Sequence, residues 1–253
     1  MLSQSESSLV LSSKKEPRLR IPRVSFMSDT YFFFIRTEVN MPDIIKISAL
    51  LRELYPDALC SLEYGGDPWR LLAAARLSAQ CTDERVNIVC VPLFRKYPDV
   101  YAMAEAKLSE VEGIIRPCGL YHTKAESLIK AAQMIVSDFG GRVPDTMEEL
   151  LSLPGVGRKI ANLVLGDVYG KPGIVADTHC IRINGRFGFY PEENRDPLKT
   201  EKILSEIVPK PEQADYCHRM VLFGREYCTA RSPRCGECPL RDECAKGRRE
   251  KIK

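Results

Sequence analysis

The sequence predicts an all-α fold for the 253-residue chain. Apolar residues recur at helical spacing from Met41 onward, and helix-start signals are repeated along the chain. Strand signals are nearly absent. The best strand candidate, GIVAD at 173–177, is too short to found a sheet.

Short capping signals divide this helical pattern into elements. The first clear helix, MPDIIKISALLRELYP, begins near Met41. Later helix starts are marked by an Asp-Pro pair or by a capping box, in which a Thr and a Glu three residues later satisfy free backbone N–H groups. In chain order these signals are Asp67–Pro68, Thr123–Glu126, Thr146–Glu149 and Asp196–Pro197. The second of these helices is expected to end at Gly140 and Gly141, and QADYCHRMVLFGREYC continues the pattern.

Charge and hydropathy exclude a membrane-spanning protein and a broadly basic one. No stretch is apolar for 18 residues, so we expect no transmembrane helix and no membrane partner. The formal charge is +3, but residues 246–253 carry +4 and residues 1–40 carry +2, which leaves −3 for the rest. Any nucleic acid must therefore bind at a local surface.

Residues 1–40 and the cysteines bear on where the protein resides. Residues 1–40 have no sustained periodicity and are expected to be a disordered extension, with an organelle-targeting segment as the alternative. Of ten cysteines, four lie within 228–244 and six are scattered through helical patterns, unlike a disulfide framework. This distribution favours a reducing, intracellular compartment, in the simplest case a bacterial cytoplasm.

The stretch LPGVGRKIANLVLG, residues 153–166, predicts a turn between two helices. One helix is expected to end near Leu153 and the next to start near Arg158. Gly155 and Gly157 permit positive φ and leave no Cβ in the way of an approaching group. Free N–H groups at such a helix start can bind a phosphate oxygen, as in a helix-hairpin-helix grip on the DNA backbone. A plain helix–helix corner explains LPGVG equally well.

Lys159 favours the functional alternative. It falls in the first turn of the second helix, where the helix dipole disfavours a cation. With an ordinary lysine pKa, fewer than about one amine in a thousand is neutral at pH 7, whereas a pKa near 8 gives about 10% free amine. Burial and a helix N-terminus both lower a lysine pKa. The position therefore suits a nucleophile that forms a Schiff base.

Asp177, in VADTHC, lies eighteen residues after Lys159 and just before another helical pattern. Its ordinary role is that of an N-cap. A carboxylate beside Lys159 would raise the pKa of the amine, so Asp177 is expected to act later in a reaction, by stabilising positive charge on a sugar or relaying a proton. The two roles are compatible.

The stretch CTARSPRCGECPLRDEC predicts a metal centre. Cys228, Cys235, Cys238 and Cys244 are separated by six, two and five residues. Four thiolates in one polar loop can enclose one metal centre, and this spacing suits zinc as well as a [4Fe–4S] cluster. No open ligand position is offered, so a structural role is expected.

Together the hairpin, the lysine, the aspartate and the cysteine loop resemble the endonuclease III family of base-excision DNA glycosylases. The resemblance runs from about Met41 to Cys244, with LPGVGRK, ADTH and the cysteine loop in family order and at family distances. LLAAARLSAQCTD and GLYHTKAE also look like family segments. His122 departs from the asparagine that is more usual at its position.

The resemblance implies two helical domains with a DNA groove between them. A six-helix domain with the hairpin would cover 62–173, and a cluster domain would combine 41–61 with 174–245. Residues 246–253 would be a basic tail that adds salt-dependent affinity for the DNA backbone. The resemblance, and not the spacing, selects a [4Fe–4S] cluster over zinc. It also implies a monomer whose partner is duplex DNA with damaged bases or abasic sites.

The resemblance further implies a bifunctional reaction. Lys159 would attack the sugar C1′ of a flipped nucleotide with Asp177 as its acidic partner, and β-elimination from the resulting imine would nick the strand. Gln80 and Leu120 would fill the vacated space, although each has an ordinary reading as an end-of-helix polar residue and a buried loop leucine. The DNA contacts implied in this way are Gln80, Leu120, Tyr121, His122, Gly155, Val156, Gly157 and Arg158.

Three other functions are weighed against removal of oxidised pyrimidines. An adenine-mismatch glycosylase would lack the lysine and carry a glutamate in the stretch corresponding to LLAAARLSAQ. A thymine-mismatch glycosylase would have tyrosine in place of Lys159. A non-catalytic DNA-binding protein whose cluster senses redox state remains an alternative from another class.

Overall fold

The computed structural model describes residues 41–249. The extension or targeting segment expected at 1–40 lies outside the described residues, as do residues 250–253. Within the described part, no helix is both long enough and apolar enough to cross a membrane.

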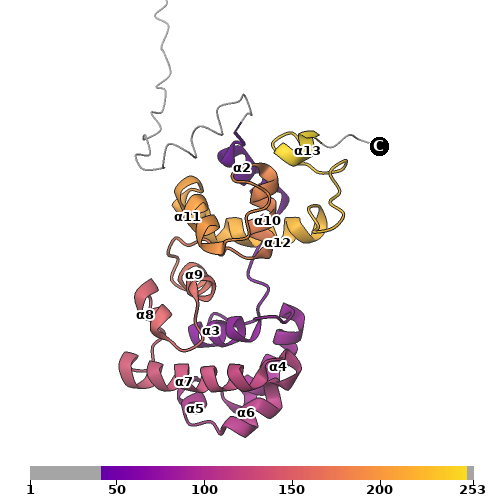
Figure 1. Ribbon diagram of the computed structural model, residues 1–253. Helices are drawn as coiled ribbons and strands as arrows, with labels where there is room; N and C mark the ends of the chain where they lie inside the picture. Colours follow the sequence, from indigo (N-terminus) through magenta and orange to yellow (C-terminus); the bar gives the residue numbers. More distant parts are fainter. Residues whose placement is uncertain (1–40, 250–253) are drawn as a thin grey trace, which may run out of the picture. The chain divides into compact units, whose positions relative to one another are not determined.

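The described residues form helices joined by turns and contain no strand, which confirms the all-α prediction (Figure 1). GIVAD at 173–177 is an irregular segment between two helices. The helices are α2 (Ile44–Leu54), α3 (Pro68–Leu77), α4 (Asp83–Lys96), α5 (Val100–Ala104), α6 (Leu108–Ile115), η1 (Arg116–Cys118), α7 (Tyr121–Phe139), α8 (Met147–Ser152), α9 (Arg158–Asp167), α10 (Thr178–Phe187), α11 (Pro197–Ile207), η2 (Lys210–Glu212), α12 (Gln213–Glu226) and α13 (Ala245–Arg249).

Most of the capping predictions hold. Asp67 and Asp196 cap α3 and α11, each with proline in the first turn. Thr146 caps α8 by accepting the Glu149 N–H at 3.3 Å. Gly140 ends α7 in the left-handed conformation, at φ 60°.

The capping box at Thr123 and Glu126 is wrong. Helix α7 begins at Tyr121, and its N-cap is Leu120, which makes no side-chain cap. The chain turns into the helix through a left-handed Leu120, whose carbonyl accepts the Lys124 N–H at 3.0 Å. The first helical hydrogen bond therefore forms ahead of Thr123, which becomes an ordinary first-turn residue.

One hydrophobic core is built from residues between Leu62 and Leu165. Helix α7 is central to it, with α3 on one side and α5 and α6 on the other (Figure 1). Trp69, Leu72, Leu128 and Ala132 are among its buried residues. Helix α9 also packs against α3, so the hairpin before α9 is anchored in this core.

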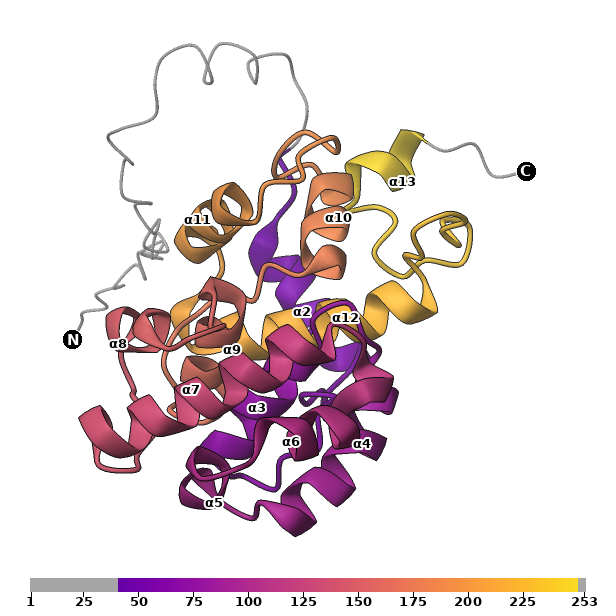
Figure 2. The same ribbon diagram turned by 60° about the horizontal axis from the view of Figure 1, so that its bottom comes forward.

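A second core combines the start of the described chain with its C-terminal part. Ile47 and Leu51 of α2 are buried with residues of α10 and α12, although α2 is far from both in sequence (Figure 2). Helix α10 packs against α12 and α13, which places the start of α13 beside the cysteine loop.

Polar contacts join the helices of the two cores. His218 Nε2 of α12 lies 2.7 Å from Asp167 Oδ1 at the end of α9, and both side chains are nearly buried. Arg158 of α9 forms an ion pair with Glu201 of α11, and Arg225 of α12 lies 3.4 Å from Asp83 of α4. Helices α9 and α12 are therefore held against each other by packing and by the contact between His218 and Asp167.

Candidate active site

The hairpin forms between α8 and α9 at the positions expected from its sequence. The Val156 N–H donates to the Leu153 carbonyl at 3.1 Å, and the Val156 side chain is buried beneath the turn. Gly155 adopts φ 80°, a left-handed conformation that favours glycine. Val156 therefore anchors the turn through its buried side chain and its N–H group.

The two glycines of the hairpin have different roles. A Cβ on Gly155 would lie 2.5 Å from Arg76 Nε and 2.8 Å from Ser127 Cβ, so this glycine is needed for packing inside the protein. A Cβ on Gly157 would meet nothing within 4 Å. Gly157 has φ −104°, so the expectation of positive φ is wrong there. Only Gly157 leaves open space for an approaching group.

Alanine substitutions should separate these roles. Gly155→Ala is expected to lower the free energy of unfolding by about 2–3 kcal/mol, because alanine is strained at positive φ and its Cβ overlaps two side chains. Gly157→Ala is the matched control and is expected to leave that free energy unchanged while weakening binding to duplex DNA. Denaturant unfolding and fluorescence anisotropy measure the two effects. Equal destabilisation by both substitutions would contradict this assignment.

Lys159 is the second residue of α9, and no side chain caps the start of this helix. The first turn also contains no acidic residue, so the free N–H groups there face outward without a neighbouring carboxylate on the same helix. The Lys159 side chain is exposed, so it is open to an approaching ligand.

Asp177 is the N-cap of α10, as its sequence context predicted. Its Oδ1 accepts the Cys180 N–H at 2.7 Å, which holds the carboxylate at the start of the helix. The charges of Asp177 and Lys159 both act on the ring of His179, so the three side chains share one neighbourhood. Burial is the main cause that lowers the pKa of His179. The Asp177 carboxylate raises this pKa and the Lys159 ammonium lowers it, each by a smaller amount than burial.

His179 is a site residue that sequence reasoning did not single out. Its Nδ1 lies 3.2 Å from an amino group of Arg182, which donates when the ring is neutral. A Cβ on Gly224 of α12 would lie 2.3 Å from this same nitrogen, so α12 passes close to the ring only because it carries a glycine there. The available signal was the position of His179 two residues after the Asp177 cap, in the first turn of α10.

Gln80 and Leu120 share an unusual backbone conformation. Their φ angles are 55° and 47°, and they are the two non-glycine residues with positive φ in the described part of the chain. Both side chains are exposed, Leu120 by 57%. Leu120 is therefore not the buried loop leucine of the ordinary reading. Strained backbone of this kind persists only where the surroundings hold it, and it clusters at functional sites.

The residues that follow Leu120 are held by their own partners. The rings of Tyr121 and His122 lie 4.1 Å apart, and His122 Nδ1 lies 2.7 Å from Glu112 Oε1 on α6. The Arg116 guanidinium lies over the Tyr121 ring at 5.6 Å. Arg158, the last of the expected DNA contacts, has its Nε 3.0 Å from Glu201 Oε2. A phosphate that binds the Arg158 guanidinium would have to share this group with the Glu201 carboxylate.

The four cysteines of the loop line one cavity. Cys228 follows α12, Cys244 precedes α13, and Cys235 and Cys238 lie between them. The cavity measures about 330 Å³ including its open mouth. A tetrahedral Cys₄ zinc site would need its sulfurs about 3.8 Å apart. Within residues 41–249, no three His, Cys, Asp or Glu side chains are arranged to hold a single ion. Four cysteine side chains around one cavity are the donor set that a [4Fe–4S] cluster requires.

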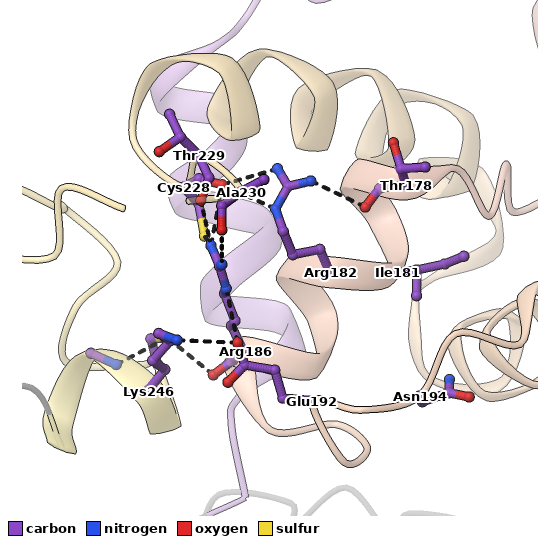
Figure 3. Close-up of polar contacts among 12 residues, drawn as sticks. Thr178, Ile181, Arg182, Arg186, Glu192, Asn194, Cys228, Thr229, Ala230 and Lys246 are labelled. Atoms are coloured by element: carbon purple, nitrogen blue, oxygen red, sulfur yellow. Dashed lines mark hydrogen bonds and ion pairs between the residues drawn. The ribbon is translucent and has the colours of Figure 1, made fainter. Parts of the chain in front are cut away.

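Two arginines of α10, the buried Arg186 and the half-buried Arg182, hold the first cysteine of the loop (Figure 3). Arg182 donates to the Cys228 carbonyl at 3.0 Å. Arg186 lies 3.3 Å from the Cys228 Sγ and donates to the Thr229 carbonyl at 2.7 Å. Sequence reasoning missed both, although arginines four residues apart share one face of a helix.

A carboxylate neutralises part of this buried charge. Glu192 lies 3.1 Å from Arg186 and 3.1 Å from Lys246, which is on α13 (Figure 3). Because Asp177 caps the same helix that carries Arg182 and Arg186, α10 connects the catalytic candidates with the cysteine cavity.

Comparison with known proteins identifies the family. Residues 73–210 match the model of the HhH-GPD superfamily of base-excision DNA repair proteins, and residues 228–244 match the iron-sulfur binding domain of endonuclease III. The chain is 44% identical to endonuclease III of Synechocystis over 79% of this chain and 90% of the relative. It is 41% identical to endonuclease III of Bacillus subtilis over 83% of this chain and 95% of the relative.

A solved structure gives the same result. The structure of a trapped endonuclease III–DNA covalent intermediate, an estranged-adenine complex, matches with a TM-score of 0.77 and 40% identity. The match covers 83% of this chain and 98% of that chain. The mismatch-glycosylase and purely DNA-binding alternatives are not favoured by these matches. The chain belongs to the endonuclease III family of DNA glycosylases with AP lyase activity, and it carries the family's [4Fe–4S] domain.

Proposed function

We propose that this enzyme releases damaged bases from duplex DNA through Lys159 as nucleophile and Asp177 as its acidic partner. The carrying observation is that the charges of Lys159, in the first turn of α9, and of Asp177, the N-cap of α10, both act on His179. A sugar seated there would face an amine, a carboxylate and a helix N-terminus. These groups supply attack, charge stabilisation and phosphate binding.

The reaction can be written step by step. The neutral Lys159 amine attacks C1′ and forms a C–N bond while the damaged base leaves with the glycosidic electron pair and takes up a proton. The Asp177 carboxylate stabilises the positive charge that develops on the sugar. Ring opening gives an iminium, loss of a C2′ proton expels the 3′ phosphate oxygen, and water then releases the enzyme.

DNA is held and opened by other residues of the same face. The hairpin from Gly155 to Arg158 binds a backbone phosphate through its free N–H groups, which do not include that of Val156 because it donates to the Leu153 carbonyl. Leu120 enters the base stack as an apolar wedge, and Gln80 pairs with the base left without its partner. Tyr121 and His122, at the start of α7, contact the strand beside the wedge. The support for these roles is the strained, exposed geometry of Gln80 and Leu120.

The remaining assignments concern domains, substrate and assembly. The separate cores support two domains, at 62–173 and at 41–61 with 174–245, with the DNA groove between them. The [4Fe–4S] cluster, held by the four loop cysteines, is structural. It shapes the loop that Arg182 and Arg186 brace. We assign oxidised pyrimidines as substrates and a monomer as the active form, in a reducing compartment that contains DNA.

Borohydride capture tests the proposed nucleophile. Duplexes with an oxidised pyrimidine, an A·8-oxoguanine pair or a T·G mismatch are incubated with enzyme and borohydride, and the adduct is mapped by peptide mass spectrometry. The oxidised pyrimidine duplex is expected to give the highest rate, with the adduct on Lys159. A crosslink on any other side chain would overturn the assignment, and preferential capture on a mismatch would overturn the proposed substrate.

A further inference from the structure

Lys124 of α7 is a fully buried lysine that the reaction above does not use. Its residue is 0% exposed, and its Nζ donates to the Leu77 and Cys118 carbonyls, each at 2.8 Å. Among the described residues, the titratable side chains that act on it are Cys118, Cys81 and Arg76, and none of these is an Asp or Glu. Lysine is almost never fully buried without an ionic partner. Its position therefore calls for a specific reason.

The two carbonyls that Lys124 binds are both at helix ends. Leu77 is the last residue of α3, and Cys118 is the last residue of η1. The final carbonyls of a helix lack partners within the helix and carry partial negative charge, so a cation is favoured there. A single ammonium group satisfies one carbonyl from each helix. It thereby ties together two chain segments that are forty-one residues apart.

Each tied segment leads directly into a strained turn. Gln80 lies three residues after Leu77, and Leu120 lies two residues after Cys118. These are the two positive-φ non-glycine residues of the described chain. A non-glycine residue at positive φ is strained, and contacts with the surrounding structure must offset the free energy of that strain. The Lys124 ammonium provides such contacts to both turns at once.

Other contacts converge on the same place. Cys118 also neighbours Cys81, the residue after Gln80, so side chains of the two turns lie near each other. Burial is the main cause that raises the pKa of Cys118 to about 11, which keeps its thiol neutral. The turns are therefore joined by the Lys124 ammonium and lie near each other at these two cysteines.

The same turn of α7 also reaches the hairpin. Ser127 Oγ donates to the Lys124 carbonyl at 2.9 Å and accepts from Arg76 Nε at 2.9 Å. Arg76 and Ser127 are the side chains packed against Gly155. The hairpin turn before α9 and the two strained turns are thus all held by contacts with the same turn of α7.

We propose that Lys124 is a positioning residue, which fixes the Gln80 and Leu120 turns at the separation needed to open a paired duplex. This inference rests on the proposed function of those two residues. Lys124 touches neither DNA nor the reacting atoms. It acts by holding both turns in place before DNA arrives, so that binding energy is not spent on ordering them.

The test compares two substrates that differ in the need for strand opening. One is a fully paired duplex with a central oxidised pyrimidine, and the other has a one-nucleotide gap opposite the lesion. Lys124→Met keeps the length of the side chain and removes its donors. It is expected to lower kcat/KM about 10- to 100-fold on the paired duplex and less than about threefold on the gapped one. Lys130→Met, an exposed position on the same helix, is the matched control and should match wild type on both.

Leu120→Ala separates this inference from the proposed function. Leu120→Ala should lower kcat/KM on the paired duplex alone. Adding Lys124→Met to the Leu120→Ala enzyme should lower it little further, because both substitutions act on the same step. If Leu120→Ala slows neither substrate, the wedge role itself is wrong. If Leu120→Ala behaves as expected but Lys124→Met slows both substrates equally, or neither, the positioning role is overturned.

If the circular dichroism signal of Lys124→Met is weaker than that of the wild type, a second pair of variants tests the proposal. Lys124→Arg keeps several donors and is expected to retain most turnover of the paired duplex. Lys124→Gln has one amide donor group and is expected to lose most turnover of the paired duplex. Equal ratios of paired to gapped turnover in these two variants would overturn the proposal.

Discussion

Replacing Lys159 by methionine is expected to abolish strand nicking and borohydride capture, with a loss of at least about 10³-fold in lyase rate. The reason is chemical: without the amine there is no C–N bond to C1′ and therefore no imine from which β-elimination can start. Methionine keeps most of the side-chain volume, and the exposed side chain of Lys159 packs against little that could collapse. Single-turnover gel assays on an abasic-site duplex measure this loss.

DNA binding should survive this substitution. The hairpin binds phosphate through backbone N–H groups, which the change at residue 159 leaves in place. The dissociation constant measured by anisotropy is therefore expected to rise less than about tenfold. Lys171→Met is the matched control, since Lys171 is an exposed lysine that pairs with Asp145 beyond the same helix. A Lys159→Met enzyme that still nicks at the wild-type rate would refute the proposed nucleophile.

Loss of one loop cysteine should have the largest effect on stability. Cys244→Ser is expected to remove the visible absorbance of the iron–sulfur cluster and to lower the free energy of unfolding by at least about 3 kcal/mol, or roughly 6–12 °C in Tm. The Cys244 sulfur lies 3.2 Å from the Arg186 carbonyl and 3.3 Å from the Gly247 N–H, so it connects the loop with α10 and α13. Without the cluster, the rest of the loop has few apolar contacts to order it.

The control for this prediction is another cysteine. Cys60→Ser changes a half-buried thiol outside the loop. It should keep the visible absorbance of the cluster and change the Tm only as much as an ordinary core substitution does. Visible absorbance, iron analysis and thermal unfolding check both variants. A Cys244→Ser protein that retains a full complement of iron would show that the cluster ligands were assigned wrongly.

Local features of the site could be read from the sequence because neighbouring residues determine them. An N-cap needs only a short polar side chain and the next three N–H groups, so Asp67, Asp177 and Asp196 were identified correctly as helix starts. The hairpin between α8 and α9 also lies where Pro154 and its glycines indicated. The cysteine spacing indicated a metal centre, and family resemblance identified it as a [4Fe–4S] cluster.

Other features depend on residues that meet only in three dimensions. The helix after Leu120 starts before the expected capping box, because a left-handed turn and the buried Lys124 ammonium set its beginning. Gly155 is required by Arg76 and Ser127, which come from other helices. Neither constraint leaves a pattern in the local sequence.

The sequence by itself therefore indicated the helical class, several helix starts, the nucleophile candidate and the candidate cluster ligands. Each of these is a property of short-range hydrogen bonding or of side-chain chemistry at a fixed spacing. Tertiary structure decided which groups from distant segments come together: His179 with Gly224 of α12, Arg186 with the Cys228 sulfur, and Lys124 with two helix ends. Those pairings depend on how helices pack, and packing brings together residues whose separation in sequence carries no information about their distance in space.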